Sequence, residues 1–202
     1  MTEEFISVTD RIISASIDII SDAGLESLTT ANISMRTNLN EVMIYKYFTD
    51  TDEILKEVVA TYFKFDKSIF RTLLSRNGSY LSRIRDYVEA YSSYYNSYYS
   101  LSAIMLQYEE LLHNTHTREM VESGFLERRK GLIELFQGAI DNSEIALSDV
   151  TAENMADYLM GIFIVCTLNR RVMPRVRSYK EELVSMYLLW IKSISSIQAD
   201  KS

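Results

Sequence analysis

Tyrosines gather in one short tract of this 202-residue sequence, and each combines an apolar ring with a polar hydroxyl. Five of them recur at helical spacing on one stripe: Tyr87, Tyr91, Tyr94, Tyr95 and Tyr98. Any single ring is most simply a core residue. Because a dry core seldom needs so many hydroxyls, the stripe as a whole predicts one wall of a pocket for an apolar or aromatic ligand. The other predicted lining residues are Met105, Phe125, Met155 and Phe163.

Other reactive side chains are few. His113 and His116 lie three residues apart, where a solvated helix end is the simpler interpretation than a metal site. Cys166 is the only cysteine, so an intrachain disulfide is excluded, and its apolar neighbours predict a buried thiol. The sequence has no Ser-His-Asp set, Gly-rich phosphate loop or spaced cysteine pattern. We therefore expect no enzyme, no metal site and no cofactor.

The elements that position these residues are predicted to be helices throughout. One proline and six glycines in a chain that is 47% hydrophobic leave few breakers for a sheet with many turns. Helical spacing of apolar residues predicts about nine helices and an all-α fold. The first covers about 5–23 and ends before Gly24. Two short helices follow, one capped by Thr29 or Thr30 and one running through Val42 to Phe48.

A capping box at Asp50 and Glu53 then opens a long helix. Longer helices are predicted over 79–96, 100–114, 118–140, about 149–170 with Ser148 as cap, and from a second box at Ser178 to about Ile197. We expect a helix-turn-helix headpiece over 1–50 and a ligand-binding and dimerisation domain over 51–202. The apolar stripes of the last two helices extend over more than one face, which predicts an isologous four-helix dimer interface.

Residues 11–55 resemble the TetR family of transcriptional regulators. The resemblance rests on Gly24 after the first helix, then Thr29 and Ile33 at plus five and plus nine, and on the Ile-Tyr-Lys-Tyr-Phe run at 44–48. It implies a helix-turn-helix whose second helix enters the major groove of DNA. The residues that it implies as DNA contacts are Thr29, Arg36, Asn40, Glu41, Met43, Tyr45, Lys46 and Tyr47. It also implies a core made by Ile33, Leu39, Ile44 and Phe48.

The same segment departs from the family pattern in charge and at several positions. Residues 1–60 contain four basic and eleven acidic side chains, a net charge of −7 that equals the charge of the whole chain. Asn38 stands at the usual turn glycine, Val42 at a usually small residue, and Thr51 where lysine is usual. Asparagine also adopts the left-handed conformation, so the turn is expected to survive. Glu41 adds a repelling charge at the expected DNA surface.

Together these features predict a homodimeric transcriptional repressor that binds a palindromic operator and is released by a small apolar or aromatic ligand. The alternative is a TetR-like interaction or ligand-sequestering protein with weakened or lost DNA binding, which the acidic headpiece favours. The N-terminus lacks the pattern of a signal peptide, and no apolar stretch reaches the roughly 18–20 residues that span a bilayer. We therefore expect a cytoplasmic protein with no membrane partner.

Overall fold

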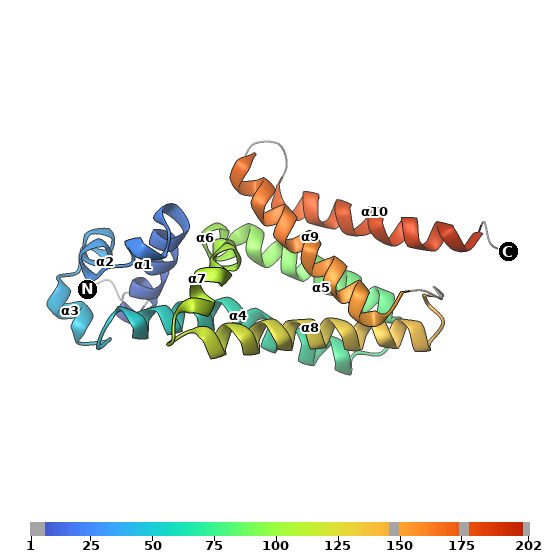
Figure 1. Cartoon of the computed structure of the whole chain (residues 1–202), viewed down its shortest axis with the longest axis horizontal. Coiled ribbons are helices and arrows are strands. Elements are labelled where there is room, and N and C mark those ends of the chain that lie inside the picture. The colour runs from blue at the N-terminus through green and yellow to red at the C-terminus, as the bar shows by residue number, and fades with distance from the viewer. Residues whose placement is uncertain (1–6, 146–149, 174–177, 200–202) are drawn as a thin grey trace, which may run out of the picture. The chain divides into compact units, whose positions relative to one another are not determined.

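The computed structural model describes residues 7–145, 150–173 and 178–199, and within these ranges it contains helices and no strand (Figure 1). The all-α prediction with about nine helices is confirmed. The α-helices are α1 (Val8–Ala23), α2 (Thr30–Thr37), α3 (Glu41–Tyr45), α4 (Thr51–Ser75), α5 (Tyr80–Ser97), α6 (Tyr99–Ser102), α7 (Tyr108–His113), α8 (Arg118–Asp141), α9 (Ala152–Val172) and α10 (Tyr179–Ala199). Two 3-10 turns, η1 (Leu25–Ser27) and η2 (Ala103–Gln107), complete them. Among the described helices, none is long and apolar enough to cross a membrane.

The chain divides into two compact units. The first comprises Met1–Lys64 and Tyr99–Ser123, and the second comprises Phe65–Tyr98 and Gly124–Ser202. Of the three boundaries, one lies within α4, one between α5 and α6, and one near the start of α8.

Local capping residues set the helix ends of the headpiece. Gly24 ends α1 with φ 84°, a conformation that glycine adopts without strain. Thr29 caps α2 by accepting a hydrogen bond from the backbone N–H of Asn32 at 3.2 Å. Asn38 then adopts the left-handed conformation with φ 55°, as expected for the residue in the place of the turn glycine. Asp50 caps α4 through the N–H of Glu53 at 2.8 Å, as the capping box predicts.

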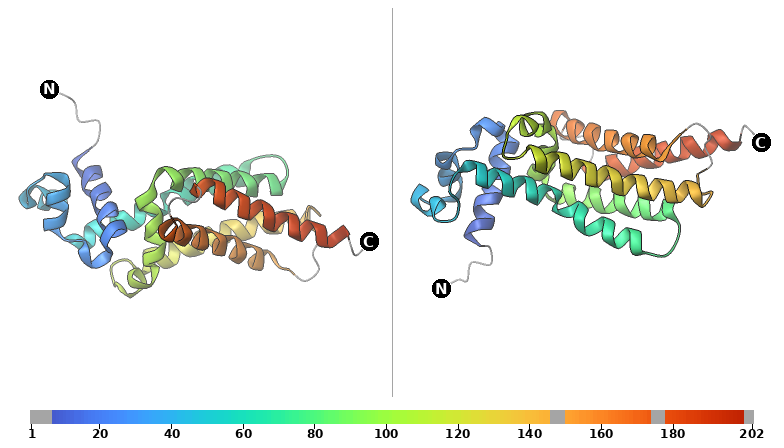
Figure 2. Two further views of the ribbon diagram at one scale, coloured as in Figure 1. Left: turned by 90° about the horizontal axis from the view of Figure 1, so that it is seen from above. Right: turned by 60° about the horizontal axis from the view of Figure 1, so that its bottom comes forward.

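The second unit packs α10 against both α5 and α9 (Figures 1 and 2). Its core includes Phe70 of α4, whose ring lies against Gly131 of α8, in the space that a larger side chain at that position would need. A Cβ atom added to Gly131 would lie 2.7 Å from the Phe70 ring, so only glycine lets the two helices approach at this point. The Phe70 ring stacks on Tyr87 of α5 with ring centroids 4.7 Å apart.

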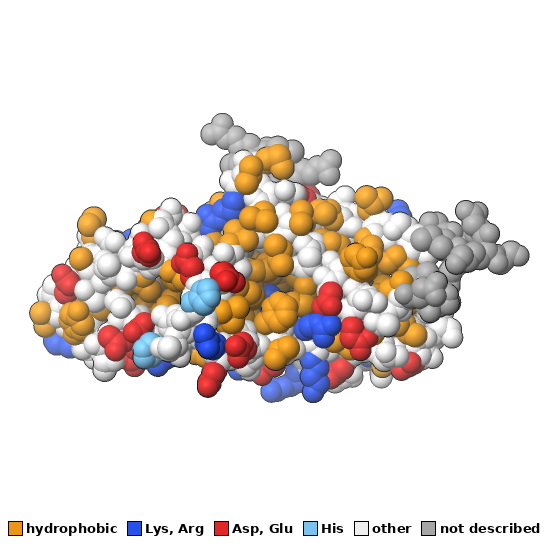
Figure 3. All heavy atoms as spheres, viewed as in Figure 1, with side chains coloured by type: hydrophobic (Ala, Val, Ile, Leu, Met, Phe, Trp, Pro, Cys, Tyr) orange, Lys and Arg blue, Asp and Glu red, His pale blue; other side chains and the backbone are white. Residues whose placement is uncertain are grey.

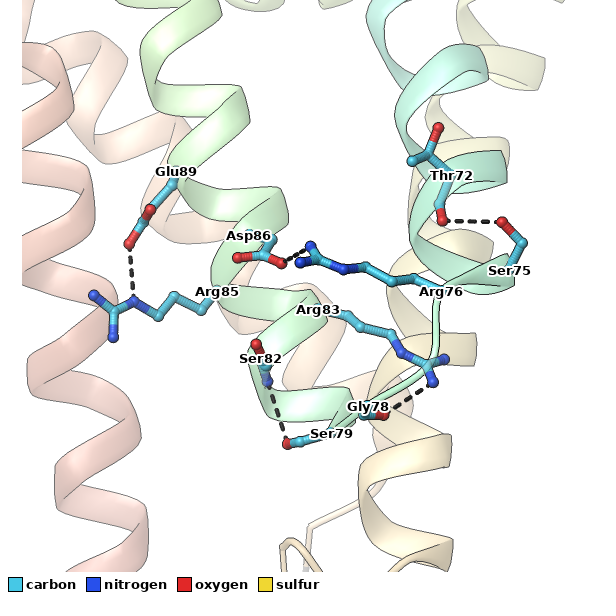
Figure 4. Close-up of polar contacts among 10 residues, drawn as sticks. All are labelled: Thr72, Ser75, Arg76, Gly78, Ser79, Ser82, Arg83, Arg85, Asp86 and Glu89. Carbon is cyan, nitrogen blue, oxygen red and sulfur yellow. Dashed lines mark hydrogen bonds and ion pairs between the residues drawn. The ribbon is translucent and has the colours of Figure 1, made fainter.

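Polar contacts fix the connection from α4 to α5, as Figure 4 shows. Ser79 caps α5 through the backbone N–H of Ser82, and the Arg83 guanidinium donates to the carbonyl oxygen of Gly78 at 3.0 Å. Arg76 at the end of α4 pairs with Asp86 one turn further along α5. The Ser79 contact satisfies a backbone N–H that the start of α5 leaves without an intrahelical partner, and the two arginines tie the connection to α5.

Helix α9 begins later than predicted. Thr151 is its cap and shares a capping box with Asn154, so the helix starts at Ala152 and not near 149. The expected cap, Ser148, lies outside the described residues. The second predicted box is confirmed, because the N–H of Glu181 donates to the Ser178 hydroxyl and the N–H of Ser178 to the Glu181 carboxylate, each at 3.2 Å.

Candidate nucleic-acid interface and aromatic cluster

A small apolar core fixes the angle between α2 and α3. Ile33 of α2 and Ile44 of α3 are fully buried, and Phe48 is 5% exposed. Leu39, expected in the same core, is only half-buried, and its carbonyl oxygen accepts a hydrogen bond from Ser34 at 2.5 Å. Arg11 of α1 donates to the carbonyl oxygen of Thr37 at 2.9 Å, which places a cation at the negative end of α2. The two short helices are therefore held as one rigid pair.

The outer surface of α3 and the turn after it is unusually apolar for an exposed helix. Val42 is 68% exposed, Tyr45 54% and Tyr47 47%, and Lys46 is exposed beside them. Methyl groups, tyrosine hydroxyls and one ammonium group are suited to thymine methyls and to phosphate oxygens. Val42, Tyr45, Lys46 and Tyr47 thus form an exposed surface with the chemistry of a DNA contact.

Two of the predicted DNA contacts at the start of α3, Asn40 and Met43, are partly used within the protein. The Asn40 side-chain oxygen accepts from the N–H of Met43 at 2.7 Å and so caps the helix. The Met43 side chain is half-buried. Asn40 retains its amide nitrogen as the group that can reach outward.

Glu41 is bound to the neighbouring helix. The Thr30 hydroxyl at the start of α2 donates to Glu41 Oε2 at 2.6 Å, and the Tyr45 hydroxyl reaches Thr30 Oγ1 at 3.5 Å. This link between α2 and α3 joins residues eleven positions apart and was not foreseen from the sequence. It fixes where the one acidic group of α3 points.

Arg36, predicted to face DNA, pairs with acids of α1. Its guanidinium binds the Asp22 carboxylate at 2.7 Å and lies 3.9 Å from that of Asp18. All three side chains are at least 40% exposed, so the pairing is a surface one. Two of the acids that make the headpiece negative thus lie against a cation.

In the second unit the tyrosine stripe is a stack of rings. Tyr87, Tyr91 and Tyr95 of α5 are at most 1% exposed. The Tyr91 ring stacks on Phe163 of α9 with centroids 4.1 Å apart, and the Tyr95 centroid lies 4.5 Å from that of Tyr91. We call these four residues, with Phe65 and Phe70 of α4, the aromatic cluster.

The other predicted lining residues are distributed around this cluster. Tyr94 is half-buried and stacks on Phe65 with centroids 5.0 Å apart. Tyr98 is 57% exposed, because α5 ends at Ser97 and Tyr98 leaves the helical stripe. Met155 is fully buried and Phe125 half-buried in the same unit. Met105 is buried in the first unit, so it belongs to a different core from the cluster.

A buried ion pair that was not predicted from the sequence lies against the aromatic cluster. Arg128 of α8 binds Asp66 of α4 through Nε at 3.0 Å and Nη2 at 2.8 Å, with exposed fractions of 1% and 4%. The Tyr87 hydroxyl donates to the other oxygen of Asp66 at 2.8 Å, and the Arg128 guanidinium lies 5.4 Å from the Tyr91 ring centroid. Two polar residues 62 positions apart carry no local signal in a sequence.

The remaining candidates for chemistry are Cys166 and the two histidines. Burial raises the pKa of the Cys166 thiol to about 12, with a smaller contribution from Glu182, so it stays protonated. His113 lies 3.8 Å from Glu109, and His116 lies 3.5 Å from Asp52. Within the described ranges, no group of three or more His, Cys, Asp or Glu side chains is arranged to hold a metal ion.

The headpiece matches a known protein family. The sequence pattern of the family described as "Bacterial regulatory proteins, tetR family" matches residues 12–58. The match confirms the predicted resemblance of this segment to the TetR family, and it supports a DNA-binding regulator. No curated protein sequence matches the chain.

Solved structures of transcriptional regulators share the fold over nearly the whole length. The ketosteroid transcriptional regulator KstR2 of Mycobacterium tuberculosis superposes with a TM-score of 0.77 at 13% identity, covering 92% of this chain and 93% of that one. FadR from Bacillus subtilis in complex with stearoyl-CoA gives 0.68 at 13% identity, covering 87% and 95%. PfmR from Thermus thermophilus, a TetR family regulator, gives 0.75 at 16% identity, covering 89% and 96%. At these identities the likeness concerns the fold.

Proposed function

We propose that this chain is a homodimeric repressor whose headpiece, residues 1–50, binds a palindromic operator and whose remainder, 51–202, binds an apolar effector. The observation that carries the DNA contact is the exposed surface of Val42, Tyr45, Lys46 and Tyr47 on a rigid α2–α3 pair. Lys46 and Tyr45 bind phosphates, and Thr29 and Asn40 lie at the ends of the same helices. Met43 of α3, also predicted to contact DNA, is half-buried.

The proposed dimer interface is the outer face of α9 and α10. Tyr158, Val165 and Leu168 of α9 are 63%, 43% and 45% exposed, and Leu189 of α10 is 72% exposed. Figure 3 shows hydrophobic side chains gathered over α9. A groove of about 530 Å³ runs between the two helices, with Gly161 and Met186 in its lining. Apolar surface of this extent is typical of a face that a second protein covers.

The proposed effector site is the aromatic cluster with its buried ion pair. Stacked rings favour an apolar or aromatic ligand, and Asp66, Arg128 and Tyr87 provide the few polar groups that orient one. That one neighbour holds stearoyl-CoA and another is named for ketosteroids supports an apolar effector here. Binding of the effector favours a conformation in which the two headpieces no longer match the operator.

Selection of genomic DNA fragments at low salt tests the DNA contact. We expect an enriched palindrome with half-sites separated by about one helical turn, roughly 34–36 Å. Lys46→Ala removes one phosphate contact from each subunit, two per dimer, so the magnitude of the slope of log K against log salt falls by about 1.8. Lys130→Ala, which removes an exposed lysine of α8, is the matched control and leaves the slope unchanged. Selection that enriches no palindrome supports the alternative, an interaction or ligand-sequestering protein with an acidic headpiece.

Light scattering tests the dimer. We expect Leu189→Glu to shift the chain to monomers, because it places a charge in the proposed interface. Leu74→Glu, at an exposed leucine of α4, is the control and leaves the mass unchanged. A wild-type chain that is monomeric at micromolar concentration would contradict this part of the proposal.

A further inference from the structure

The carboxylate of Glu41 in α3 is oriented by a neutral hydroxyl of the neighbouring helix, whereas Asp18 and Asp22 of α1 lie against the Arg36 guanidinium. The Thr30 hydroxyl donates to Glu41 Oε2 at 2.6 Å, and the Tyr45 hydroxyl lies 3.5 Å from Thr30 Oγ1. Within the described part of the chain, Thr30 is the hydrogen-bond donor to this carboxylate, which leaves Oε1 for a donor outside the protein. Glu41 is exposed, so that donor can approach.

A fixed carboxylate on a DNA-contacting surface is selective among base edges. It repels the acceptor atoms of guanine, which are O6 and N7, and the O4 atom of thymine. It accepts from the amino groups of cytosine, N4, and of adenine, N6. In adenine the amino group stands beside the acceptor N7, which repels a carboxylate, whereas the cytosine edge carries no acceptor beside N4. Cytosine is therefore the base that Glu41 fits best.

The neighbour of Glu41 extends this chemistry. Val42 follows directly in α3 and is 68% exposed, and an apolar side chain in the major groove contacts the C5-methyl group of thymine. A carboxylate and a branched methyl side chain at adjacent positions thus present an acceptor and an apolar surface together. A lysine or arginine at the same place would instead select guanine.

We propose that Glu41 is a specificity-determining residue that reads the N4 amino group of a cytosine in each operator half-site. The proposal rests on the proposed function, because it requires that α3 lie in the major groove. In this proposal the negative charge of Glu41 contributes to specificity. The carboxylate weakens binding to DNA in general and selects the sites that offer an amino group.

Selection of DNA from a random pool by wild-type protein and by Glu41→Gln tests the proposal. Wild type is expected to enrich cytosine at one position of each half-site by about tenfold over the other bases, the usual cost of one wrong base pair. A glutamine amide pairs with adenine through N6 and N7, so Glu41→Gln is expected to change that position from cytosine to adenine. Circular dichroism and thermal melting verify that the variant keeps the fold, since the glutamine oxygen can still accept from Thr30.

Glu26→Gln is the matched control. It removes the same charge from an exposed position of the headpiece outside α3, so it raises affinity for all sequences and leaves the base preference unchanged. An enriched operator whose preferences are the same for wild type and Glu41→Gln overturns the Glu41 assignment and leaves the proposed function intact. A wild-type chain that enriches no sequence overturns both.

Discussion

Two arginines make nearly the same contact in two very different surroundings. Arg36 in the headpiece binds Asp22 at 2.7 Å, and Arg128 in the second unit binds Asp66 at 2.8 Å. The side chains of the first pair are 40% and 54% exposed, and those of the second are 1% and 4% exposed. Water screens the charges of the first pair. In the second pair, Arg128 and Asp66 have lost their hydrating water and contact each other, and Asp66 also accepts a hydrogen bond from the Tyr87 hydroxyl.

The difference separates the tasks of the two regions. An exposed ion pair contributes about 0–1 kcal/mol, so Arg36 can exchange Asp22 for a phosphate at little cost. Removing one member of a buried pair leaves an uncompensated charge and costs about 3–5 kcal/mol. The headpiece therefore has charges that can change partners. The aromatic cluster has charges that hold α4 and α8 in one arrangement.

Breaking the buried pair is expected to have the largest effect. Arg128→Met leaves Asp66 unpaired among aromatic rings, and we expect the free energy of unfolding to fall by about 3–5 kcal/mol in urea titrations. The double variant Asp66→Leu with Arg128→Met removes both charges and is expected to recover most of that loss. If Arg128→Met is as stable as wild type, the buried pair contributes no more to stability than the exposed pair, which would contradict the difference drawn between them.

Close packing beside the pair is the next test. Gly131→Ala places a Cβ atom about 2.7 Å from the Phe70 ring, which is buried and stacked on Tyr87. Overpacking costs about 1–3 kcal/mol, and the gain in helix propensity offsets about 1 kcal/mol of it. We expect a net loss of up to about 2 kcal/mol, measured by urea unfolding. Adding Phe70→Leu frees space, so the cost of the added methyl group should shrink in that background. An unchanged cost would show that Phe70 is not the obstacle.

The Glu144 carboxylate of the second unit is half-buried, so its exposure lies between that of the Arg36–Asp22 pair and that of the Arg128–Asp66 pair. Glu144 accepts from the backbone N–H groups of Tyr80 and Leu81 at 2.9 and 2.8 Å and from the Ser79 hydroxyl at 2.7 Å. Burial alone would raise its pKa, but these hydrogen bonds outweigh it and the pKa of Glu144 is lowered below the usual 4.5. Its stabilisation of the start of α5 is therefore complete above about pH 4.5 and is lost as the pH falls through the lower, folded pKa.

Comparison of wild type with Glu144→Gln measures this contribution. We expect wild type to be more stable by about 1 kcal/mol at pH 7, as for the loss of a helix cap, with the difference narrowing below about pH 4.5. The measurement is the urea midpoint from pH 7 to pH 3. A difference that stays constant over this range would exclude the ionised carboxylate as its cause.

The sequence predicted best what short segments determine alone. Gly24, Thr29 and Asn38 set the ends of α1 and α2 through their own backbone conformations and side chains, and each acts within a few residues. The burial of Ile33 and Ile44 also follows from local helical spacing. This is why the headpiece could be described closely from its residues.

Contacts between distant segments could not be predicted in the same way. Asp66 and Arg128 are ordinary charged residues in their own helices, and only the fold brings them together. Arg36 was expected to face DNA because cations do so, yet acids of α1 lie within its reach. The Thr30–Glu41 bond spans two helices and a turn whose angle the sequence does not state. In each case the missing information is the relative placement of two helices.

Breaking the exposed Arg36–Asp22 pair is expected to have the smallest effect on stability, and it tests whether Arg36 can bind DNA instead. Asp22→Asn is expected to change the free energy of unfolding by less than about 1 kcal/mol, because the pair is screened by water. It also releases Arg36, which then gains one phosphate contact in each subunit, so operator binding tightens and the salt slope of the dimer steepens by about 1.8. Glu26→Gln removes the same charge at an exposed position and should tighten binding without the steeper slope. Equal slopes in the two variants would show that Arg36 acts through the net charge of the headpiece, since a new phosphate contact releases counterions and a change of net charge alone does not.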